Sequence, residues 1–292
     1  MKNQKISLWS WVIYLLLAVI WGSSFKLMKE SLHYFRFDEI ASFRVLLAGI
    51  ALSPFAILGW KKFDKSKIKY AVMMGLFGSS IPAFLFPAAQ VHVPSGVAGV
   101  LNSLTPIFVL LIGIVFFKSD YTRTKVLGII TGFAGTIGLI LFTHSGDGNT
   151  QAQFALLIVI GTMMYGLSNQ ILQRFLQTEN PVTITAIAFL MVSPFAAAYL
   201  FITPVLSVFK TDPNAWKGFS YIATLSLGGT ALALPLYNYL AQQTGVLFAS
   251  TLTFVMPVIS LAWALKDGEP LGPQHIVCMV IILLGVYLVR KK

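Results

Sequence analysis

Charged residues are scarce in this sequence. Asp, Glu, Lys and Arg make up only 11% of the 292 residues, whereas 57% are apolar, and the mean hydropathy is +0.79. A soluble domain contains about 25% charged residues. A chain this poor in charge has too little polar surface to face water, but a lipid bilayer solvates an apolar exterior. The composition therefore predicts an integral membrane protein.

Several residue patterns that support catalysis or ATP hydrolysis are also missing. The single cysteine, Cys278, excludes an intramolecular disulfide and a cysteine-based metal site. No Gly-Lys-Ser or Gly-Lys-Thr forms a phosphate-binding loop, which argues against an ATP-driven pump. The four histidines are scattered near predicted loops, and no Asp or Glu lies at the midpoint of a predicted helix. We therefore expect no enzyme activity, no cofactor and no metal site.

The charge that is present is mainly positive. Lys and Arg number 21 against 10 Asp and Glu, which gives a net charge of +11. The basic residues lie in short segments between apolar runs, so we expect no nucleic-acid partner. If the N-terminus is cytoplasmic, the segments on that side hold 14 Lys and Arg, and the opposite loops hold six. This bias predicts that both termini lie in the cytoplasm.

Apolar runs of about 20 residues, the length that crosses a bilayer as a helix, recur along the chain. Polar breaks such as residues 144–151 separate them, and nothing resembles a soluble domain. The first run is too long for a signal peptide and lacks a cleavage site, so we expect it to be retained. We predict an all-α membrane protein with ten transmembrane helices, at residues 10–29, 39–59, 69–89, 97–117, 125–143, 153–174, 183–204, 218–240, 248–265 and 274–290.

Two stretches of the chain, residues 93–120 and 244–270, share a pattern. Each has small residues early in a helix, a polar residue four positions before a proline, and a charged turn at its end. The polar and proline pairs are Asn102 with Pro106 and Thr253 with Pro257. Chance similarity of two apolar helices is the alternative, but the next helices also share a glycine at nearly the same offset.

This pattern predicts an internal repeat of five helices, residues 1–145 and 146–292. Because five is odd, the second copy must enter the membrane from the opposite side. Inverted repeats of this kind occur in many transporters, where the two halves open a central site to each side in turn. Glycines also pattern the fifth predicted helix, where Gly128 and Gly132 form a GxxxG motif that we expect to pack closely against another helix.

Short motifs follow one another along nearly the whole chain. They are, in order, Trp21-Gly22-Ser23-Ser24-Phe25, Arg44-Val45-Leu46-Leu47-Ala48, the segment 102–106, Gly228-Gly229-Thr230-Ala231, Ala249-Ser250 with Pro257, Glu269-Pro270-Leu271 and Leu283-Leu284-Gly285-Val286-Tyr287. In the order and spacing of these motifs, the chain resembles EamA-type members of the drug/metabolite transporter superfamily. It departs from the family pattern at Lys118-Ser119-Asp120, where a Glu is usual, and at Lys26.

The resemblance implies ten helices in two inverted repeats around a central cavity. It also implies export or exchange of small metabolites such as amino acids. We therefore expect a secondary transporter or facilitator that works by alternating access in a bacterial-type cytoplasmic membrane. Its partners would be a small-molecule substrate and the lipid bilayer, and it would act as a monomer. A membrane-embedded enzyme and an ion channel are the alternatives.

A substrate site in such a protein lies near the middle of the bilayer, between the repeats. Polar groups at that depth are costly unless they face a cavity or another helix. Serine and threonine can instead bond to the preceding turn, single aromatic rings can face lipid, and prolines can simply curve a helix. For Pro106 and Pro257, which recur at matched positions in the two halves, we favour a hinge or shape role. The predicted cavity set, from helices 1, 3, 4, 6, 8 and 9, is Trp21, Ser24, Pro82, Phe86, Asn102, Pro106, Tyr165, Asn169, Thr230, Tyr237, Thr253 and Pro257.

Two cationic residues are further candidates. Arg44 lies inside the second predicted helix, where an unpaired charge is costly. It can bind a substrate carboxylate, pair with Asp38 or Glu39, or extend to the membrane surface, and we favour the structural role because it is near a helix end. Lys26 closes the first helix. It can extend to the interface, which we favour, or supply a cation at the mouth of the cavity.

The lack of an acidic residue at mid-depth also bears on energetics. Proton-coupled transporters commonly use a buried Asp or Glu within the membrane. We therefore predict facilitated diffusion or exchange, or else coupling through a peripheral carboxylate such as Asp38, Glu39 or Glu269.

Overall fold

The computed structural model describes residues 7–118, 122–142, 150–268 and 272–290, and these fold into helices without a strand. The α-helices are α1 (Leu8–Ser31), α2 (Phe37–Trp60), α3 (Ile68–Gly75), α4 (Ile81–Gln90), α5 (Ser95–Asn102), α6 (Thr105–Phe117), α7 (Arg123–Phe142), α8 (Thr150–Phe175), α9 (Pro181–Ile202), α10 (Val205–Thr211), α11 (Ala215–Ser226), α12 (Ala233–Thr244), α13 (Val246–Ser250), α14 (Met256–Lys266) and α15 (Pro273–Arg290). Short 3₁₀ and π segments join some of them, namely η1 (Lys65–Lys67), η2 (Leu76–Ser80), η3 (Leu227–Leu232) and η4 (Thr251–Phe254).

Within these described ranges, eight helical segments are long and apolar enough to cross a membrane. They are Leu8–Ser31, Phe37–Trp60, Lys65–Gln90, Ser95–Phe117, Gln153–Phe175, Pro181–Ile202, Ala215–Thr244 and Val246–Lys266. Each overlaps one predicted span, so the all-helical, multi-pass membrane class is confirmed. Helices α7 and α15 lie at the two remaining predicted spans but are not among the eight. The count of ten membrane-spanning helices therefore stays a prediction.

The outer surface of the bundle is apolar. Phe195, Phe201 and Ile202 at the end of α9 are 77%, 87% and 80% exposed, respectively. Exposing such side chains to water would be unfavourable, whereas hydrocarbon solvates them at no cost. Trp9 and Trp216 are exposed near helix ends, where tryptophan suits the boundary between lipid and water. The surface is therefore built for a bilayer.

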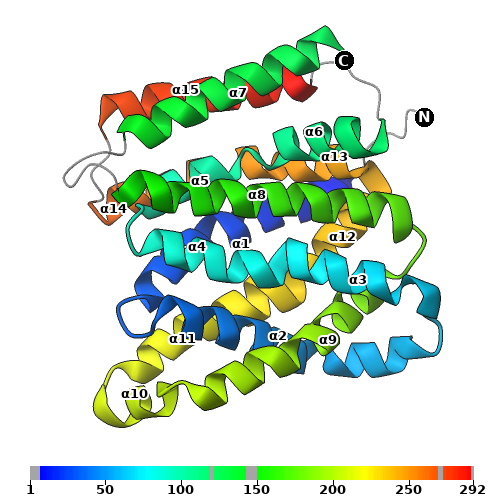
Figure 1. The fold of residues 1–292 in the computed structure, drawn as a ribbon, viewed down its shortest axis with the longest axis vertical. Helices are drawn as coiled ribbons and strands as arrows, with labels where there is room; N and C mark the ends of the chain where they lie inside the picture. The colour runs from blue at the N-terminus through cyan, green and yellow to red at the C-terminus, as the bar shows by residue number, and fades with distance from the viewer. Residues whose placement is uncertain (1–6, 119–121, 143–149, 269–271, 291–292) are drawn as a thin grey trace.

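The helices of the two halves of the chain are interleaved (Figure 1). Helix α1 packs against α11, α12 and α14 from the second half, and α8 packs against α3, α4 and α6 from the first half. Helices α2 and α9 lie side by side along their length. Because each half contributes helices to the contacts of the other, the centre of the bundle is formed jointly.

Helices α7 and α15 form a separate pair along one edge of the bundle (Figure 1). Glycines make this contact close. A Cβ atom added to Gly285 would lie 2.6 Å from the Gly132 Cα and 2.7 Å from the Gly128 carbonyl oxygen. The prediction that the GxxxG motif packs closely against another helix is therefore confirmed.

Four of the membrane helices are interrupted, at corresponding places in the two halves. A π-helical turn, η2, precedes Pro82 in the segment Lys65–Gln90, and another, η3, precedes Pro235 in the segment Ala215–Thr244. The segment Ser95–Phe117 breaks between α5 and α6 just before Pro106, and the segment Val246–Lys266 passes through η4 before Pro257. Proline has no N–H to donate to the preceding turn, so the helix rearranges there.

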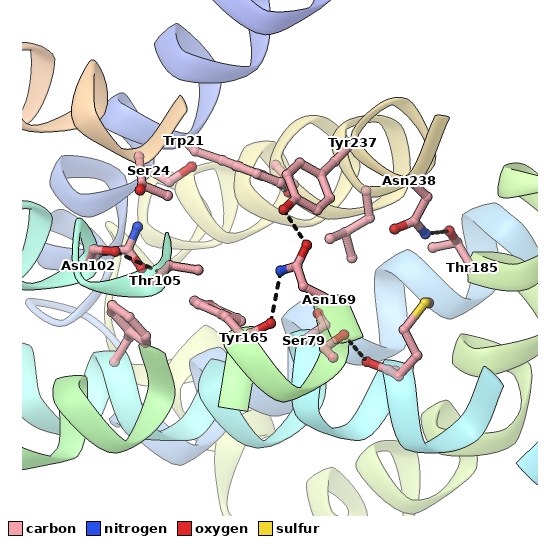
Figure 2. Close-up of a pocket in the computed structure, with 18 of the residues that line it drawn as sticks. Trp21, Ser24, Ser79, Asn102, Thr105, Tyr165, Asn169, Thr185, Tyr237 and Asn238 are labelled. Atoms are coloured by element: carbon pink, nitrogen blue, oxygen red, sulfur yellow. Dashed lines mark hydrogen bonds between the residues drawn. The ribbon is translucent and has the colours of Figure 1, made fainter. Parts of the chain in front are cut away.

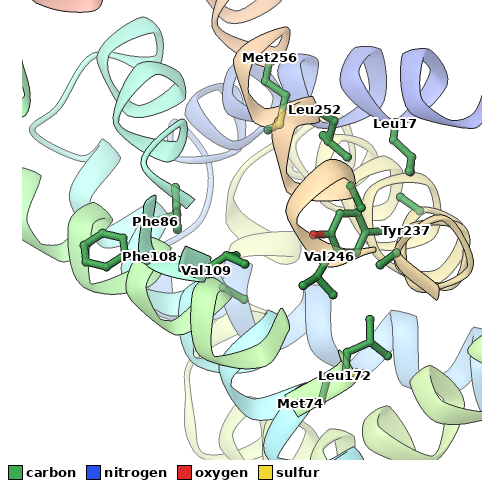
Figure 3. Close-up of a cluster of buried hydrophobic side chains, with 14 of the residues drawn as sticks. Leu17, Met74, Phe86, Phe108, Val109, Leu172, Tyr237, Val246, Leu252 and Met256 are labelled. Carbon is green, nitrogen blue, oxygen red and sulfur yellow. The ribbon is translucent and has the colours of Figure 1, made fainter. Parts of the chain in front are cut away.

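Apolar side chains from both halves fill the spaces beside these interruptions (Figure 3). Leu17 and Leu252 are fully buried, and Met256 and Leu172 are nearly so. Such packing fixes the helix positions around the interrupted segments, where backbone carbonyls and polar side chains are brought to the centre of the protein.

Candidate substrate cavity

A cavity lies at the centre of the described part of the bundle (Figure 2). The volume of its interior, counted as the space open to the centre of a water molecule, is about 110 Å³. One water needs roughly 10–15 Å³ by this measure, so the cavity has room for a solute of on the order of ten heavy atoms. Its walls are Trp21, Ser24, Phe25, Met28, Arg44, Met74, Gly75, Gly78, Ser79, Phe86, Asn102, Thr105, Tyr165, Ser168, Asn169, Leu172, Thr185, Phe189, Gly229, Leu234, Tyr237, Asn238, Thr253 and Met256.

The structure brings together most of the residues predicted for the cavity. Those on its wall are Trp21, Ser24, Arg44, Phe86, Asn102, Tyr165, Asn169, Tyr237 and Thr253. Those that do not line it are Lys26, Pro82, Pro106, Thr230 and Pro257. All six helices of the predicted set contribute to the wall, and so do α2 and α9, which were not in that set. Whether these side chains bind a substrate stays a prediction.

A chain of hydrogen bonds crosses the cavity between α12 and α8 (Figure 2). The Tyr237 hydroxyl donates to Asn169 Oδ1 at 2.5 Å, and Asn169 Nδ2 donates to the Tyr165 carbonyl oxygen at 2.8 Å. The Asn169 amide thus joins the phenol of one helix to the backbone of another. Tyr237 is 8% exposed and Asn169 is 6% exposed, so both bonds are screened little by water.

Trp21 connects this chain of hydrogen bonds to the first half of the protein. Its ring centroid lies 5.3 Å from that of Tyr237, and its indole Nε1 donates to the Gly229 carbonyl oxygen at 2.8 Å. That carbonyl is available because Gly229 lies in the π-helical turn η3, where the regular pattern of backbone hydrogen bonds is broken. The turn therefore holds an aromatic wall of the cavity in place.

The same turn holds Arg44. Thr230 was predicted to line the cavity, but it is fully buried behind the wall. Its Oγ1 accepts a hydrogen bond of 3.0 Å from Arg44 Nε. Thr230 in turn donates to the Leu225 carbonyl oxygen at 3.3 Å. Thr230 therefore orients the arginine from behind while the guanidinium faces the cavity.

Arg44 pairs with neither Asp38 nor Glu39, which were two of the alternatives considered for it. Asp38 is instead held by Arg36 at 2.7 Å and by the Tyr199 hydroxyl at 2.6 Å, and Glu39 accepts from the Arg36 backbone N–H at 3.0 Å. No acidic side chain in the described ranges forms an ion pair with Arg44. Asp38 and Glu39 precede Arg44 by six and five residues, one to two helical turns, but α2 turns Arg44 toward the cavity.

The three predicted prolines act through the backbone and do not line the wall. Pro106 follows the break between α5 and α6, and this break places Asn102 and Thr105 on the cavity. Pro257 similarly follows η4, which carries Thr253. Pro82 follows η2, which contributes Gly78 and Ser79. The hinge or shape role of Pro106 and Pro257 stays a prediction.

Asn102 is the polar residue at the first of these breaks. It is 4% exposed, and its Nδ2 lies 3.8 Å from the Met256 sulfur, a weak acceptor. Its Oδ1 has no hydrogen-bond partner among the described residues. Because a buried amide oxygen without a partner is unfavourable, Asn102 is ready to accept a hydrogen bond from a molecule in the cavity.

Some wall residues were missed by the sequence reasoning. Asn238 Nδ2 donates to Thr185 Oγ1 at 2.9 Å, and Phe189 lies one turn beyond Thr185. An amide inside an apolar helix is a usable signal, so Asn238 could have been found in the sequence. Thr185 and Phe189 carry no such signal, because the sequence does not reveal which face of α9 points inward.

Lys26 lies off the cavity wall, in an ion pair between α1 and α14. Its Nζ is 2.5 Å from Asp267 Oδ1 and 3.9 Å from Glu30 Oε1, and it lies 4.9 Å from the centre of the Trp263 ring. The side chains of Lys26 and Asp267 are 23% and 30% exposed. The pair thus joins a helix of the first half to one of the second, at a partly exposed end of the bundle.

We expect the substitution Asp267→Asn to have a small effect on stability. A partly exposed ion pair contributes about 0–1 kcal/mol, so the apparent Tm should fall by only a few degrees. The measurement is thermal unfolding of the purified protein in low and high salt. Salt screens the pair in the wild type, so the difference between the two proteins should shrink as salt rises. A large loss of stability that is independent of salt would contradict this.

Comparison with known proteins gives a consistent result along the whole chain. The sequence pattern of the EamA-like transporter family matches this chain twice, at residues 9–141 and at residues 153–291. A protein of Archaeoglobus fulgidus named as an uncharacterized transporter is 27% identical over 97% of this chain and 99% of its own length. A Salmonella typhimurium protein, "Probable amino-acid metabolite efflux pump", is 23% identical over 94% of this chain and 92% of its own. A solved crystal structure shares the fold, with a TM-score of 0.65 over 96% of both chains at 16% identity.

Proposed function

Because the chain belongs to the EamA-like transporter family, we propose that it is a secondary transporter or facilitator that exports small organic solutes, amino-acid-like molecules among them, across the cytoplasmic membrane. The names of its relatives indicate a membrane transporter and not an enzyme. The name of the Salmonella relative, a probable amino-acid metabolite efflux pump, supports export as the direction.

The central cavity is the observation that carries this proposal. It lies inside a membrane protein, is lined by helices of both halves, and combines aromatic walls with amide, hydroxyl and guanidinium groups. Ligand sites are typically mainly apolar with a few polar groups that fix orientation. A cavity for a solute of on the order of ten heavy atoms suits a small metabolite better than a large lipid or peptide.

We propose that the site opens to each side of the membrane in turn. Two features support this: the family matches the two halves separately, and the helix interruptions recur at corresponding places in both. Interrupted helices bend more readily than regular ones, so the segments beside η2 and η3 can move while the packed helices stay rigid. In this proposal the inverted repeats exchange conformations and the protein acts as a monomer.

Transport by the wild-type protein is the direct test. Purified protein is reconstituted into liposomes loaded with unlabelled amino acids and related metabolites, and entry of a trace of the labelled compound is followed. Counterflow into liposomes that contain the wild-type protein, and none into liposomes without protein, supports the proposal. A reaction product formed from any compound would instead favour a membrane-embedded enzyme, and a current without solute saturation would favour a channel.

We also propose that transport is not coupled to protons. No acidic side chain lines the cavity in the described ranges, Asp38 is held by Arg36 and Tyr199, and Glu39 Oε2 accepts from the Arg36 backbone N–H. Glu269, the third peripheral candidate, lies outside the described residues. An imposed pH gradient should therefore change the rate of counterflow less than about twofold, since no titrating group is used in the cycle. Uphill accumulation of solute driven by the gradient would contradict this.

A further inference from the structure

The charge of the cavity is unbalanced. Arg44 is the charged side chain on its wall, and none of the described wall residues is acidic. A buried charge without a counter-charge is costly in a membrane protein, since neither water nor lipid solvates it well. An anion inside the cavity would remove that cost. A cation would increase it.

The geometry of Arg44 suits a planar anion. Its Nε is used by Thr230, and no other hydrogen bond from the guanidinium is found within the described ranges. Its two terminal nitrogens therefore remain to be paired from the cavity side. These nitrogens form a fixed fork that matches the two oxygens of a carboxylate. Because Thr230 fixes the side chain in advance, little entropy is lost when the anion binds.

The rest of the wall narrows the class of solute. The Asn102 Oδ1 acceptor, buried and without a described partner, suits an N–H or O–H group on the solute. The aromatic side chains of Phe25, Phe86 and Phe189 supply apolar surface for the solute's body. A phosphate would also meet a guanidinium, but its second negative charge would find no further cation on this wall. A carboxylate carries the single charge that matches.

We infer that the cavity binds organic carboxylates. The carboxylate would pair with the Arg44 guanidinium, a hydrogen-bond donor of the solute would bind Asn102 Oδ1, and the apolar body of the solute would pack against the three phenylalanine side chains. This rests on the proposed function, because it takes the cavity to be the substrate site. It makes Arg44 the residue that selects acids over amides and organic cations, and Thr230 the residue that positions it.

The test measures binding to the purified full-length protein. The probes are leucine, phenylalanine and 3-phenylpropionate, each beside its carboxamide, titrated by calorimetry. At least one carboxylate should bind the wild type about tenfold or more tightly than its amide, since a charge-assisted hydrogen bond contributes about 1.5–3 kcal/mol. Arg44→Gln should remove that preference, and Arg44→Lys should keep part of it. Arg123→Gln is the matched control, because Arg123 is exposed at the start of α7.

A second variant tests the donor site. Asn102→Leu should weaken binding of phenylalanine, which has an ammonium donor, more than that of 3-phenylpropionate, which has none. A merely structural loss would weaken both equally. The inference is overturned if no carboxylate binds the wild type, if the amides bind as tightly, or if Arg44→Gln leaves their ratio unchanged while the variant elutes and melts as a folded protein.

The failure of this inference and that of the proposed function are distinguishable. Counterflow of leucinamide in preference to leucine would leave the transporter proposal intact and overturn the carboxylate site. Tight, Arg44-dependent binding of a carboxylate that shows no counterflow would support the carboxylate site and contradict transport.

Discussion

Replacing Asn169 by leucine is expected to reduce transport by about tenfold or more. The Asn169 amide accepts from the Tyr237 hydroxyl at 2.5 Å and donates to the Tyr165 carbonyl oxygen. Leucine would leave the buried phenol without its partner, at a cost of about 1–3 kcal/mol. The aromatic wall that Tyr237 shares with Trp21 would then lose its fixed position. The measurement is the initial rate of counterflow per reconstituted protein.

A companion variant separates this effect from general damage. Tyr237→Phe removes the same hydrogen bond from the other side, so the double variant should be little worse than either single one. Thr224→Val is a suitable control, because Thr224 is exposed on α11 and bonds only to its own helix. If single substitutions of Trp21, Asn102, Tyr165 and Asn169 all left transport unchanged, the cavity would not be the transport site.

The second large effect is expected for Gly285→Val, which should prevent α7 and α15 from packing. A Cβ at this position would meet the backbone of Gly132 and Gly128, and backbone cannot move aside as a flexible side chain can. Overpacking commonly costs about 1–3 kcal/mol, and a β-branched residue against backbone should exceed that range. We expect little or no monodisperse protein on size exclusion, with Gly285→Ala intermediate.

Gly228 provides the matched control for this substitution. A Cβ added there meets nothing within 4 Å, so Gly228→Ala should leave the elution profile and the apparent Tm close to those of the wild type. A fully folded Gly285→Val protein with wild-type thermal stability would show that α7 and α15 are free to separate without consequence.

The fold was the more predictable part of this protein. Hydropathy alone located eight helical segments that the structure bears out, because lipid requires long apolar runs and satisfied backbone groups. The sequence also pointed to the glycine contact at Gly132 and to the prolines that interrupt the helices. These are local signals, since each depends on residues close together in the chain.

The side-chain partners at the site were less predictable. The bonds from Arg44 to Thr230 and from Trp21 to Gly229 join residues 186 and 208 positions apart. A single sequence does not show such pairings, nor which face of α9 turns Thr185 inward. For the prolines, the sequence indicated the places where the helices are interrupted, but not that the break next to Pro106 puts Asn102 and Thr105, rather than the proline, on the wall.

The π-helical turns η2 and η3 have a consequence for how the cavity could change. A π-turn accommodates one residue more than the α-helical turn that it replaces. Deletion of one residue from Leu227–Leu232 would therefore let this segment close as a regular α-helix, and the residues that follow would keep nearly the same orientation. Tyr237 and Asn238 would stay on the wall, but the Gly229 carbonyl oxygen would accept a backbone N–H of the next turn in place of the Trp21 indole. In this protein the extra residue of a π-turn, as much as the identity of the side chains, decides which backbone acceptors reach the cavity wall.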